Sequence, residues 1–236
     1  IWRFPAAPYK QQKAGMLSEA EDEFLRNAYP DDELAGALAK QAGRQALGLP
    51  EGASPRPDSG LALVLASNFG AWETQEWLWR EKQDLGTVSL ASQQHWEDFL
   101  PGLARSLGCA GGCQQLSFSC ASGTAALGAG WDIIRAGRAE RVLVIAFDIL
   151  GEFCWCGLHN LHTITSDTMR PFDRRRSGTI FSEGAAAVLL EREDDRAASA
   201  APAQYLIGAA TNNNAYHLTA PRPEAEGSRE VIQEAL

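Results

Sequence analysis

Two continuous apolar runs constrain the fold of this chain more than any other feature. Residues 61–66 read Leu-Ala-Leu-Val-Leu-Ala, and residues 141–147 read Arg-Val-Leu-Val-Ile-Ala-Phe. Short runs without polar alternation, followed by turn residues such as Gly70, are typical of strands buried on both faces. Such strands belong to parallel sheets that carry helices on either side, so the two runs predict an α/β fold.

Further patterns extend this alternation of strands and helices. Residues 185–190 and 205–210 are predicted strands, and residues 17–47, broken near Pro30, and 92–107 are predicted helices. A charged, alanine-rich stretch at 191–203 is the predicted link between two halves. The first half covers residues 1–190, and residues 204–236 start the second.

Composition excludes several classes of function. The chain has 236 residues, of which 45% are hydrophobic, and its net charge of −9 argues against a nucleic-acid-binding surface. Five cysteines are an odd number without the spacing of a disulfide scaffold, which favours a reducing, cytoplasmic compartment. No apolar run reaches the length of a membrane span.

A cysteine at the predicted junction of a short strand and a helix is the candidate nucleophile. Cys120 follows the approach Ser-Phe-Ser and precedes small residues at 121–126, which would let a substrate approach the sulfur. The positive end of a helix dipole favours a thiolate, and amides of the first helical turn can hold an oxyanion. The alternative is a buried, inert cysteine.

Four motifs follow one another along the chain, each beside a predicted strand. They are Ser-Cys-Ala-Ser-Gly-Thr-Ala-Ala-Leu at 119–127, Arg-Pro-Phe-Asp at 170–173, Arg-Ser-Gly-Thr-Ile-Phe-Ser-Glu-Gly-Ala at 176–185 and Asn-Asn-Ala-Tyr-His-Leu-Thr-Ala-Pro at 213–221. In this order they resemble the motifs of β-ketoacyl-ACP synthases, the condensing enzymes of the thiolase fold. Ser177, Thr179 and Ser182 depart from the family pattern, which usually has Asp, Phe and Gly there.

The resemblance implies a layered αβαβα architecture of two similar halves, here most of the first half and the start of the second. It also implies a two-step reaction: Cys120 takes an acyl group from a thioester, and decarboxylated malonyl-ACP then attacks it. The expected partners are an acyl carrier protein with acyl and malonyl thioesters and, in a dimer, a second copy or a related subunit. No cofactor and no metal is expected.

The substrate-binding residues that the resemblance implies come from three segments. They are Ser119, Phe153, Cys154, Trp155, Leu158 and Phe181. Because the family often has glycine-rich sequence with one aromatic gate at 153–158, Trp155 is expected to narrow the acyl channel. A metal-binding interpretation of Cys154, Cys156, His159 and His162 is disfavoured, because the cysteine pair lacks the usual two-residue spacing.

The two catalytic histidine motifs of the family do not occur in these residues, and neither does its first-strand signature. We therefore expect this chain to be the middle portion of a condensing enzyme. His217 belongs to a separate loop motif and is expected to be structural or to line the entrance. A non-catalytic partner subunit, of the kind that sets chain length, and another thiolase-fold acyltransferase stay open as alternatives.

Charged residues supply two further expectations. Glu183 is expected to be structural, with its carboxylate satisfying buried amides or an arginine. Two groups of arginines, at 174–176 and at 135, 138 and 141, could contact an acidic carrier protein, or could be solvated surface charges.

Overall fold

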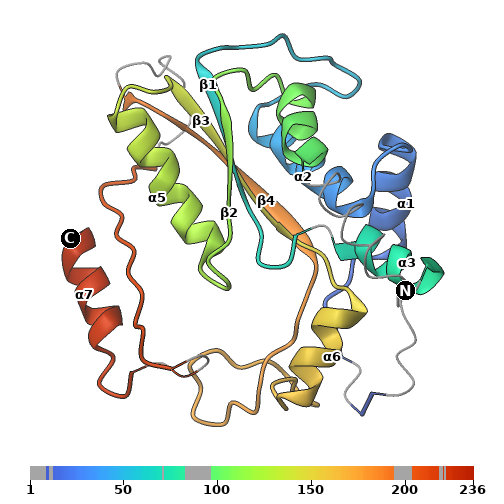
Figure 1. Ribbon diagram of the computed structural model, residues 1–236, viewed down its shortest axis with the longest axis vertical. Helices are drawn as coiled ribbons and strands as arrows, with labels where there is room; N and C mark the ends of the chain where they lie inside the picture. The colour runs from blue at the N-terminus through green and yellow to red at the C-terminus, as the bar shows by residue number, and fades with distance from the viewer. Residues whose placement is uncertain are drawn as a thin grey trace.

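The described residues of the computed structural model form a four-stranded sheet with helices on both faces (Figure 1). The structure describes residues 9–10, 13–70, 72–82, 97–193, 204–217, 220 and 222–236. The strands are β1 (Leu61–Ala66), β2 (Cys113–Leu116), β3 (Arg141–Asp148) and β4 (Gly184–Glu191), in the order β2-β1-β3-β4. β1 runs parallel to β2 and β3, which confirms the predicted α/β class. β4 is an antiparallel edge strand beside β3.

The two apolar runs become the central strand pair because their side chains alternate between two cores. Leu63 and Leu65 face a cluster built with α1 (Glu19–Ala28), α2 (Leu34–Ala46) and a helix over residues 97–106. Ala62 and Val64 face the opposite cluster, which is built with α5 (Ser122–Arg135). Each face of the strand therefore needs apolar residues, and no polar alternation is possible.

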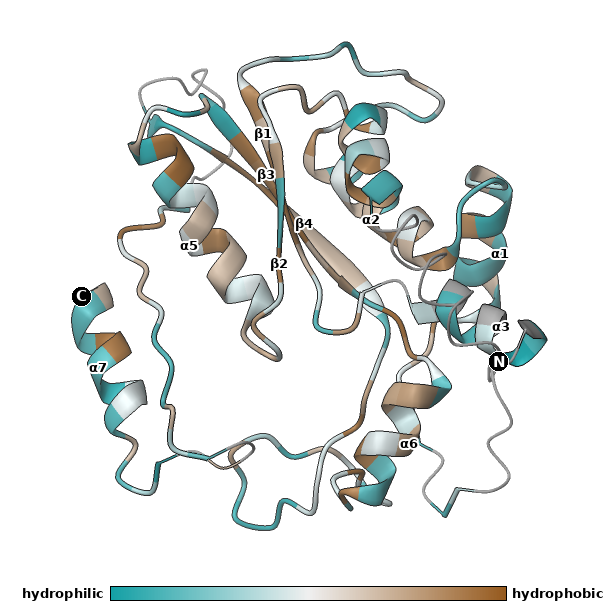
Figure 2. Ribbon diagram, in the orientation of Figure 1, coloured by the Kyte–Doolittle hydropathy of each residue, from teal (hydrophilic) through white to brown (hydrophobic). Residues whose placement is uncertain are grey.

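The helical region predicted at 17–47 is two helices, because the chain turns at Pro30 between α1 and α2. The outer helices α1 and α7 (Glu226–Ala235) are mostly hydrophilic, whereas the central strands β1 and β3 are mostly hydrophobic (Figure 2). α3 (Trp72–Lys82) and α6 (Glu152–Asn160) lie beyond one end of the sheet (Figure 1). Among the helices that the structure describes, none combines the length and the apolar character needed to cross a bilayer.

The prediction of a strand at residues 205–210 is wrong. This segment has no ladder partner among the described residues and passes between α5 and α7 (Figure 1), where a Cβ on Gly128 would lie 3.2 Å from the Cβ of Ala209. A strand needs a neighbouring strand for its backbone hydrogen bonds, and here its neighbours are helices. Residues 194–203 of the predicted link lie outside the described residues, and the division into halves stays a prediction.

Gly108 is a turn position where a side chain cannot fit. Its φ is +75°, and an added Cβ would lie 2.7 Å from the carbonyl oxygen of Arg56. Gly108→Ala should therefore lower the free energy of unfolding by about 1–3 kcal/mol more than Gly48→Ala does. Gly48 is the matched control, since its φ is +62° and nothing lies within 4 Å of the added Cβ. Urea unfolding measures both, and equal costs would contradict the packing argument.

Candidate active site

Cys120 lies in the turn between β2 and α5, with its side chain exposed. Ala121 is the N-cap residue of α5 and has no side chain that can cap the helix. The cysteine therefore stands directly before the positive end of a helix, as its sequence context predicts. Exposure also removes the alternative of a buried, inert thiol.

A serine hydroxyl holds this turn in shape. The hydroxyl of Ser122 accepts a hydrogen bond from the amide of Phe118 at 2.8 Å and donates one to the carbonyl of Ser119 at 2.6 Å. Ser119 has a φ of +51°, a left-handed conformation that is unfavourable for a residue with a side chain. The buried Ser122 side chain thus offsets strain directly beside the candidate nucleophile.

The amides of the turn are only partly free to meet a substrate. The amide of Ala121 donates to the carbonyl of Phe118, and the amide of Ser122 donates to the carbonyl of Ser119, each at 3.1 Å. Oxyanion binding by the first helical turn would therefore have to use amides beyond Ser122. Of the small residues at 121–126, Ala126 is fully buried against the sheet, so it serves packing rather than substrate approach.

A cavity of about 240 Å³, here called the Cys120 cavity, opens beside the cysteine. The carboxyl ends of β1 and β3 and the start of α5 meet around it, because parallel strands end at the same edge of a sheet. Its lining residues are Ala66, Ser67, Asn68, Phe69, Ser119, Cys120, Ser122, Gly123, Ala146, Phe147, Asp148, Ile149, Leu150, Cys154, Phe181 and Ser182.

Asp148, the last residue of β3, organises one wall of the Cys120 cavity. One of its carboxylate oxygens accepts hydrogen bonds from the hydroxyl of Ser67 at 2.9 Å and from the amides of Asn68 at 2.9 Å and Phe69 at 3.1 Å. The hydroxyl of Ser67 in turn accepts a bond from the amide of Gly70 at 2.6 Å. This network ties the loop after β1 to the end of β3 and places Phe69 in the wall.

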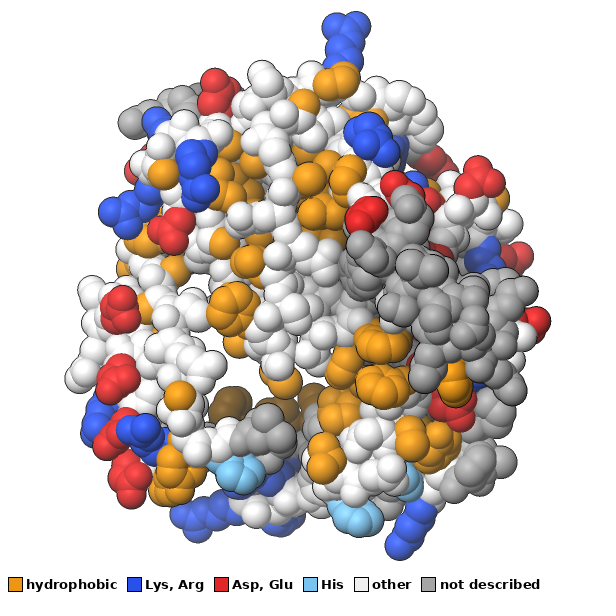
Figure 3. Space-filling model, in the orientation of Figure 1, with side chains coloured by type: hydrophobic (Ala, Val, Ile, Leu, Met, Phe, Trp, Pro, Cys, Tyr) orange, Lys and Arg blue, Asp and Glu red, His pale blue; other side chains and the backbone are white. Residues whose placement is uncertain are grey.

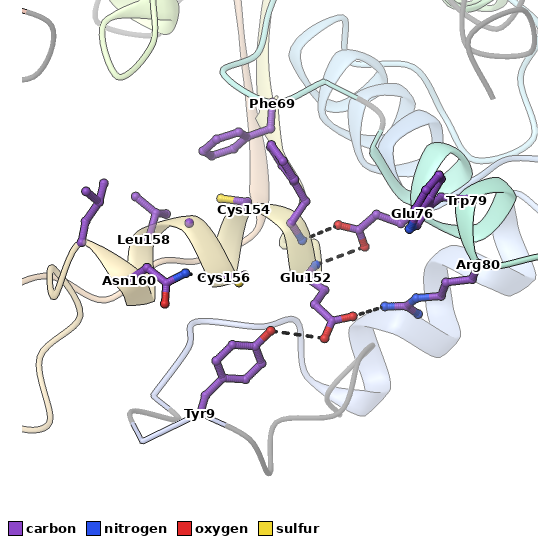
Figure 4. Close-up of a pocket in the computed structure, with 13 residues that line it drawn as sticks. Tyr9, Phe69, Glu76, Trp79, Arg80, Glu152, Cys154, Cys156, Leu158 and Asn160 are labelled. Carbon is purple, nitrogen blue, oxygen red and sulfur yellow. Dashed lines mark hydrogen bonds and ion pairs between the residues drawn. The ribbon is translucent and has the colours of Figure 1, made fainter. Parts of the chain in front are cut away.

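A second cavity, of about 640 Å³, lies between α3 and α6 and is here called the α3–α6 cavity (Figure 4). Its lining is mostly aromatic, aliphatic or sulfur-containing. The residues are Tyr9, Phe69, Glu76, Trp79, Arg80, Glu152, Phe153, Cys154, Cys156, Gly157, Leu158, Asn160 and Leu161. In the space-filling view, hydrophobic side chains gather over α6 beside a hollow in the lower part of this face (Figure 3).

Charged side chains at the edge of the α3–α6 cavity already have hydrogen-bond or ion-pair partners. The carboxylate of Glu76 accepts bonds from the amides of Phe153 at 2.7 Å and Glu152 at 3.1 Å, so α3 caps the start of α6 (Figure 4). Glu152 forms an ion pair with Arg80 and accepts a bond from the hydroxyl of Tyr9 at 3.2 Å. Burial, and then the charge of Glu152, raise the pKa of Tyr9 to about 12.

The structure gathers six of the seven predicted site residues around these two cavities. Ser119, Cys120, Cys154 and Phe181 line the Cys120 cavity, and Phe153, Cys154 and Leu158 line the α3–α6 cavity. Trp155 is fully buried and packs with Leu150 and Ile164, with the ring of Tyr9 at its edge, 6.4 Å away. Trp155 lines neither cavity, because its side chain packs α6 against the core on the other side of the helix. Its effect on an acyl channel stays a prediction.

Sequence reasoning missed Phe69 and Asp148. Both follow the apolar runs at 61–66 and 141–147, and polar or aromatic residues directly after buried parallel strands are the available signal for such positions. The expected structural role of Glu183 fits its contacts, since its buried carboxylate accepts a bond from the amide of Leu17 at 3.0 Å.

Among the described residues, the other cysteines and histidines do not gather into a second site. Burial raises the pKa of the thiols of Cys109 and Cys154 to about 12, which keeps both neutral at physiological pH. In the described part of the chain, no group of three or more His, Cys, Asp or Glu side chains could hold a metal ion. His217 accepts a hydrogen bond from the amide of Ala220 at 3.1 Å, a contact within its own loop.

Comparison with known proteins identifies the family. The family model of the beta-ketoacyl synthase N-terminal domain matches residues 32–196. This chain therefore belongs to the β-ketoacyl synthase family, as its motifs predict.

It is 32% identical, over 63% of its length, to the tetracenomycin polyketide synthase ketoacyl synthase alpha subunit of Streptomyces glaucescens. It is 26% identical, over its whole length, to 3-oxoacyl-acyl-carrier-protein synthase 2 of Staphylococcus aureus. The matched region spans 38% of the first relative and 62% of the second.

Solved structures share the fold. The ishigamide ketosynthase/chain length factor matches the whole chain with a TM-score of 0.78 at 24% identity, over 61% of its own length. A beta-ketoacyl synthase from Burkholderia phymatum matches 86% of the chain with a TM-score of 0.68 at 21% identity, over 53% of its own length. These structural matches confirm the predicted thiolase-like fold.

The Ser122 hydroxyl should contribute measurably to stability. Ser122→Ala leaves the amide of Phe118 without its partner and removes one of the two hydrogen bonds to the carbonyl of Ser119, so we expect a loss of about 1–3 kcal/mol in the free energy of unfolding. Ser117→Ala, at an exposed serine of the same segment, should stay within about 0.5 kcal/mol. Chemical unfolding of both variants tests this, and equal effects would show that the hydroxyl does not support the turn.

Proposed function

We propose that this chain carries the nucleophile of a β-ketoacyl-ACP synthase. The observation that carries the proposal is the exposed Cys120 at the start of α5, lining a cavity that adjoins a larger apolar one. A nucleophile needs access, a favourable field for its thiolate and space for the group it accepts. The exposure, the helix start and the two cavities supply these three requirements.

In the first step, the thiolate of Cys120 attacks the carbonyl carbon of an acyl thioester. A new carbon–sulfur bond forms, the bond to the carrier's sulfur breaks, and the carrier leaves as a thiolate that takes up a proton. Sulfur suits this exchange because it is both a good nucleophile and a good leaving group.

In the second step, malonyl-ACP loses carbon dioxide and its carbanion attacks the acyl carbon on Cys120. A carbon–carbon bond forms, the carbon–sulfur bond to Cys120 breaks, and a β-ketoacyl-ACP leaves. We assign no residue of this chain to decarboxylation. We propose that residues 204–236 begin the second half of the fold. We further propose that the two catalytic histidines of the family, which do not occur in these residues, come from elsewhere in the condensing enzyme.

A non-catalytic partner subunit is the second candidate. Two of the matched solved structures contain a chain length factor, and one of them, from Xenorhabdus doucetiae, is the ketosynthase ApeO in complex with ApeC, matched at 23% identity with a TM-score of 0.62. The accessible thiol of Cys120 favours the catalytic role, because a pocket-shaping subunit has no need of an exposed nucleophile.

Acyl transfer to Cys120 separates the two candidates. The natural protein, together with any chains that copurify, is incubated with an acyl-ACP. We expect one acyl group to be added, and peptide mass spectrometry should map it to Cys120. Cys120→Ala should abolish the label. Cys113→Ser, at the other exposed cysteine, should leave it intact. Absence of acyl transfer to Cys120 would favour the partner-subunit role.

The two arginine groups are not equally placed for a carrier protein. Arg135, Arg138 and Arg141 lie at the far end of α5 and β3, about 20 Å from the Cys120 turn along a helix of 14 residues. Arg141 also pairs with Asp58 at 2.6 Å. Residues 174–176 are exposed on the segment that leads back to Phe181 in the Cys120 cavity. We therefore propose that residues 174–176 contact the acidic carrier.

Charge reversal tests this docking surface. Arg174→Glu should weaken the apparent affinity for acyl-ACP by about tenfold at low ionic strength, and added salt should reduce the difference. Arg138→Glu is the matched control at the distant arginine group and should leave the affinity unchanged. A larger effect of Arg138→Glu would move the docking surface to the end of α5.

A further inference from the structure

A third cavity lies between α1, the last turns of α2 and the turn at residues 49–54, and is here called the α1–α2 cavity. Both helices pack on the face of the sheet opposite α5, the helix that follows Cys120. The volume is about 550 Å³, within the range of about 300–1,000 Å³ that small-molecule sites occupy. No described residue of this cavity lines the Cys120 cavity or the α3–α6 cavity.

Arg44, in the last turn of α2, ties the turn at residues 49–54 to the helix and lines the cavity. Its Nη1 donates a hydrogen bond to the carbonyl of Ala53 at 2.8 Å, and its Nη2 donates one to the carbonyl of Pro50 at 2.6 Å. These bonds fix the guanidinium, yet no described carboxylate neutralises its charge, and its Nε–H bonds to no described residue. A fixed, unpaired guanidinium favours an anion, because its planar N–H groups match a carboxylate.

Tyr29, the C-cap residue of α1, orients a second donor in the same cavity. Its hydroxyl donates to Oε1 of Gln41 at 2.8 Å, so the amide nitrogen of Gln41, which bonds to no described residue, is left for a ligand. Burial raises the pKa of Tyr29, which keeps its hydroxyl a donor. Gln41 and Arg44 are three residues apart on α2, so both donors project from one face of the helix.

Aromatic and aliphatic side chains supply the apolar surface of the cavity. Phe24 is 45% exposed on α1, whose surface is otherwise mostly polar, and it lines the cavity together with Tyr29 and Leu49. Among the described lining residues, Glu51 is the single acidic one, and it is exposed on the turn. The cavity therefore offers donors and a positive charge beside rings, with one carboxylate that opposes an anion.

We propose that the α1–α2 cavity binds an organic anion with an aromatic body. The carboxylate of the ligand meets Arg44 and Gln41, and its ring packs against Phe24 and Tyr29. Because the sheet lies between this cavity and α5, such a ligand occupies a site separate from that of an acyl group on Cys120. The inference does not depend on the proposed function, and both ligands can be bound at once.

Isothermal titration calorimetry with 2-naphthoate and its neutral analogue 2-naphthamide tests the site, on the natural protein with any chains that copurify. Wild type should bind naphthoate more tightly than naphthamide. Arg44→Gln should weaken naphthoate by at least about tenfold, the scale of one hydrogen bond to a charged group, and leave naphthamide unchanged. Phe24→Ala should weaken both. The matched controls are Arg105→Gln and Phe172→Ala, at exposed residues that line none of the three cavities, and they should change neither affinity.

Glu51→Gln decides the matter if the loss of Arg44 opens the turn and weakens both probes. This variant removes a repelling charge and none of the hydrogen bonds given above, so naphthoate affinity should rise about two- to fivefold while naphthamide stays unchanged. An unchanged naphthoate affinity in Glu51→Gln would then overturn the proposal.

Three other results also overturn it: no binding of naphthoate to wild type, equal affinities for the two probes, or naphthoate binding that neither Phe24→Ala nor Arg44→Gln weakens, as for a ligand in the α3–α6 cavity. Cys120→Ala should leave naphthoate binding intact. The site therefore stands or falls separately from acyl transfer to Cys120.

Discussion

The pairing of β1 with β3 is the constraint on which the rest of the structure depends. Val64 pairs with Val144 and Leu63 with Leu143, and all four side chains are buried. Complete burial of such side chains contributes about 1.5–3 kcal/mol each, and here it occurs on both faces of the sheet. Because helices must cover both faces, α2 and α5 are held on opposite sides, and the positions of the connecting loops follow.

The candidate site inherits its geometry from this core. Parallel strands end at the same edge, so the loop after β1, the end of β3 and the turn before α5 converge there. Polar side chains then fix each piece: Asp148 holds the loop that carries Phe69, and Ser122 holds the turn that carries Cys120. The strained backbone at Ser119 persists because the buried hydroxyl of Ser122 bonds to both sides of it. Hydrogen bonds among neighbouring residues therefore fix the position of the proposed nucleophile, Cys120.

Prediction from the sequence succeeds where the signal is local. The apolar runs and the small residues after Cys120 specify strands and a strand-to-helix junction, and both are present. It fails where the outcome depends on neighbours distant in sequence. The segment at 205–210 is apolar enough for a strand, but its neighbours are α5 and α7, and it pairs with no strand in the part of the chain that the structure describes. The ring of Trp155 lies in the core and lines neither cavity, and its effect on an acyl channel stays a prediction.

The sequence by itself determined the α/β class, the candidate nucleophile and the family, because periodicity and short motifs are properties of adjacent residues. The motifs also implied Ser119, Cys154 and Phe181 beside Cys120, but only the tertiary structure showed how distant elements hold the cavity wall and that Phe69 and Asp148 belong to it. Phe69 lies in the wall of the Cys120 cavity because Asp148, 79 residues later, accepts its amide. Cys154 lies there because Glu76, from α3, caps the start of α6. Contacts between residues so far apart depend on how the sheet brings its strand ends together, and no local pattern encodes them.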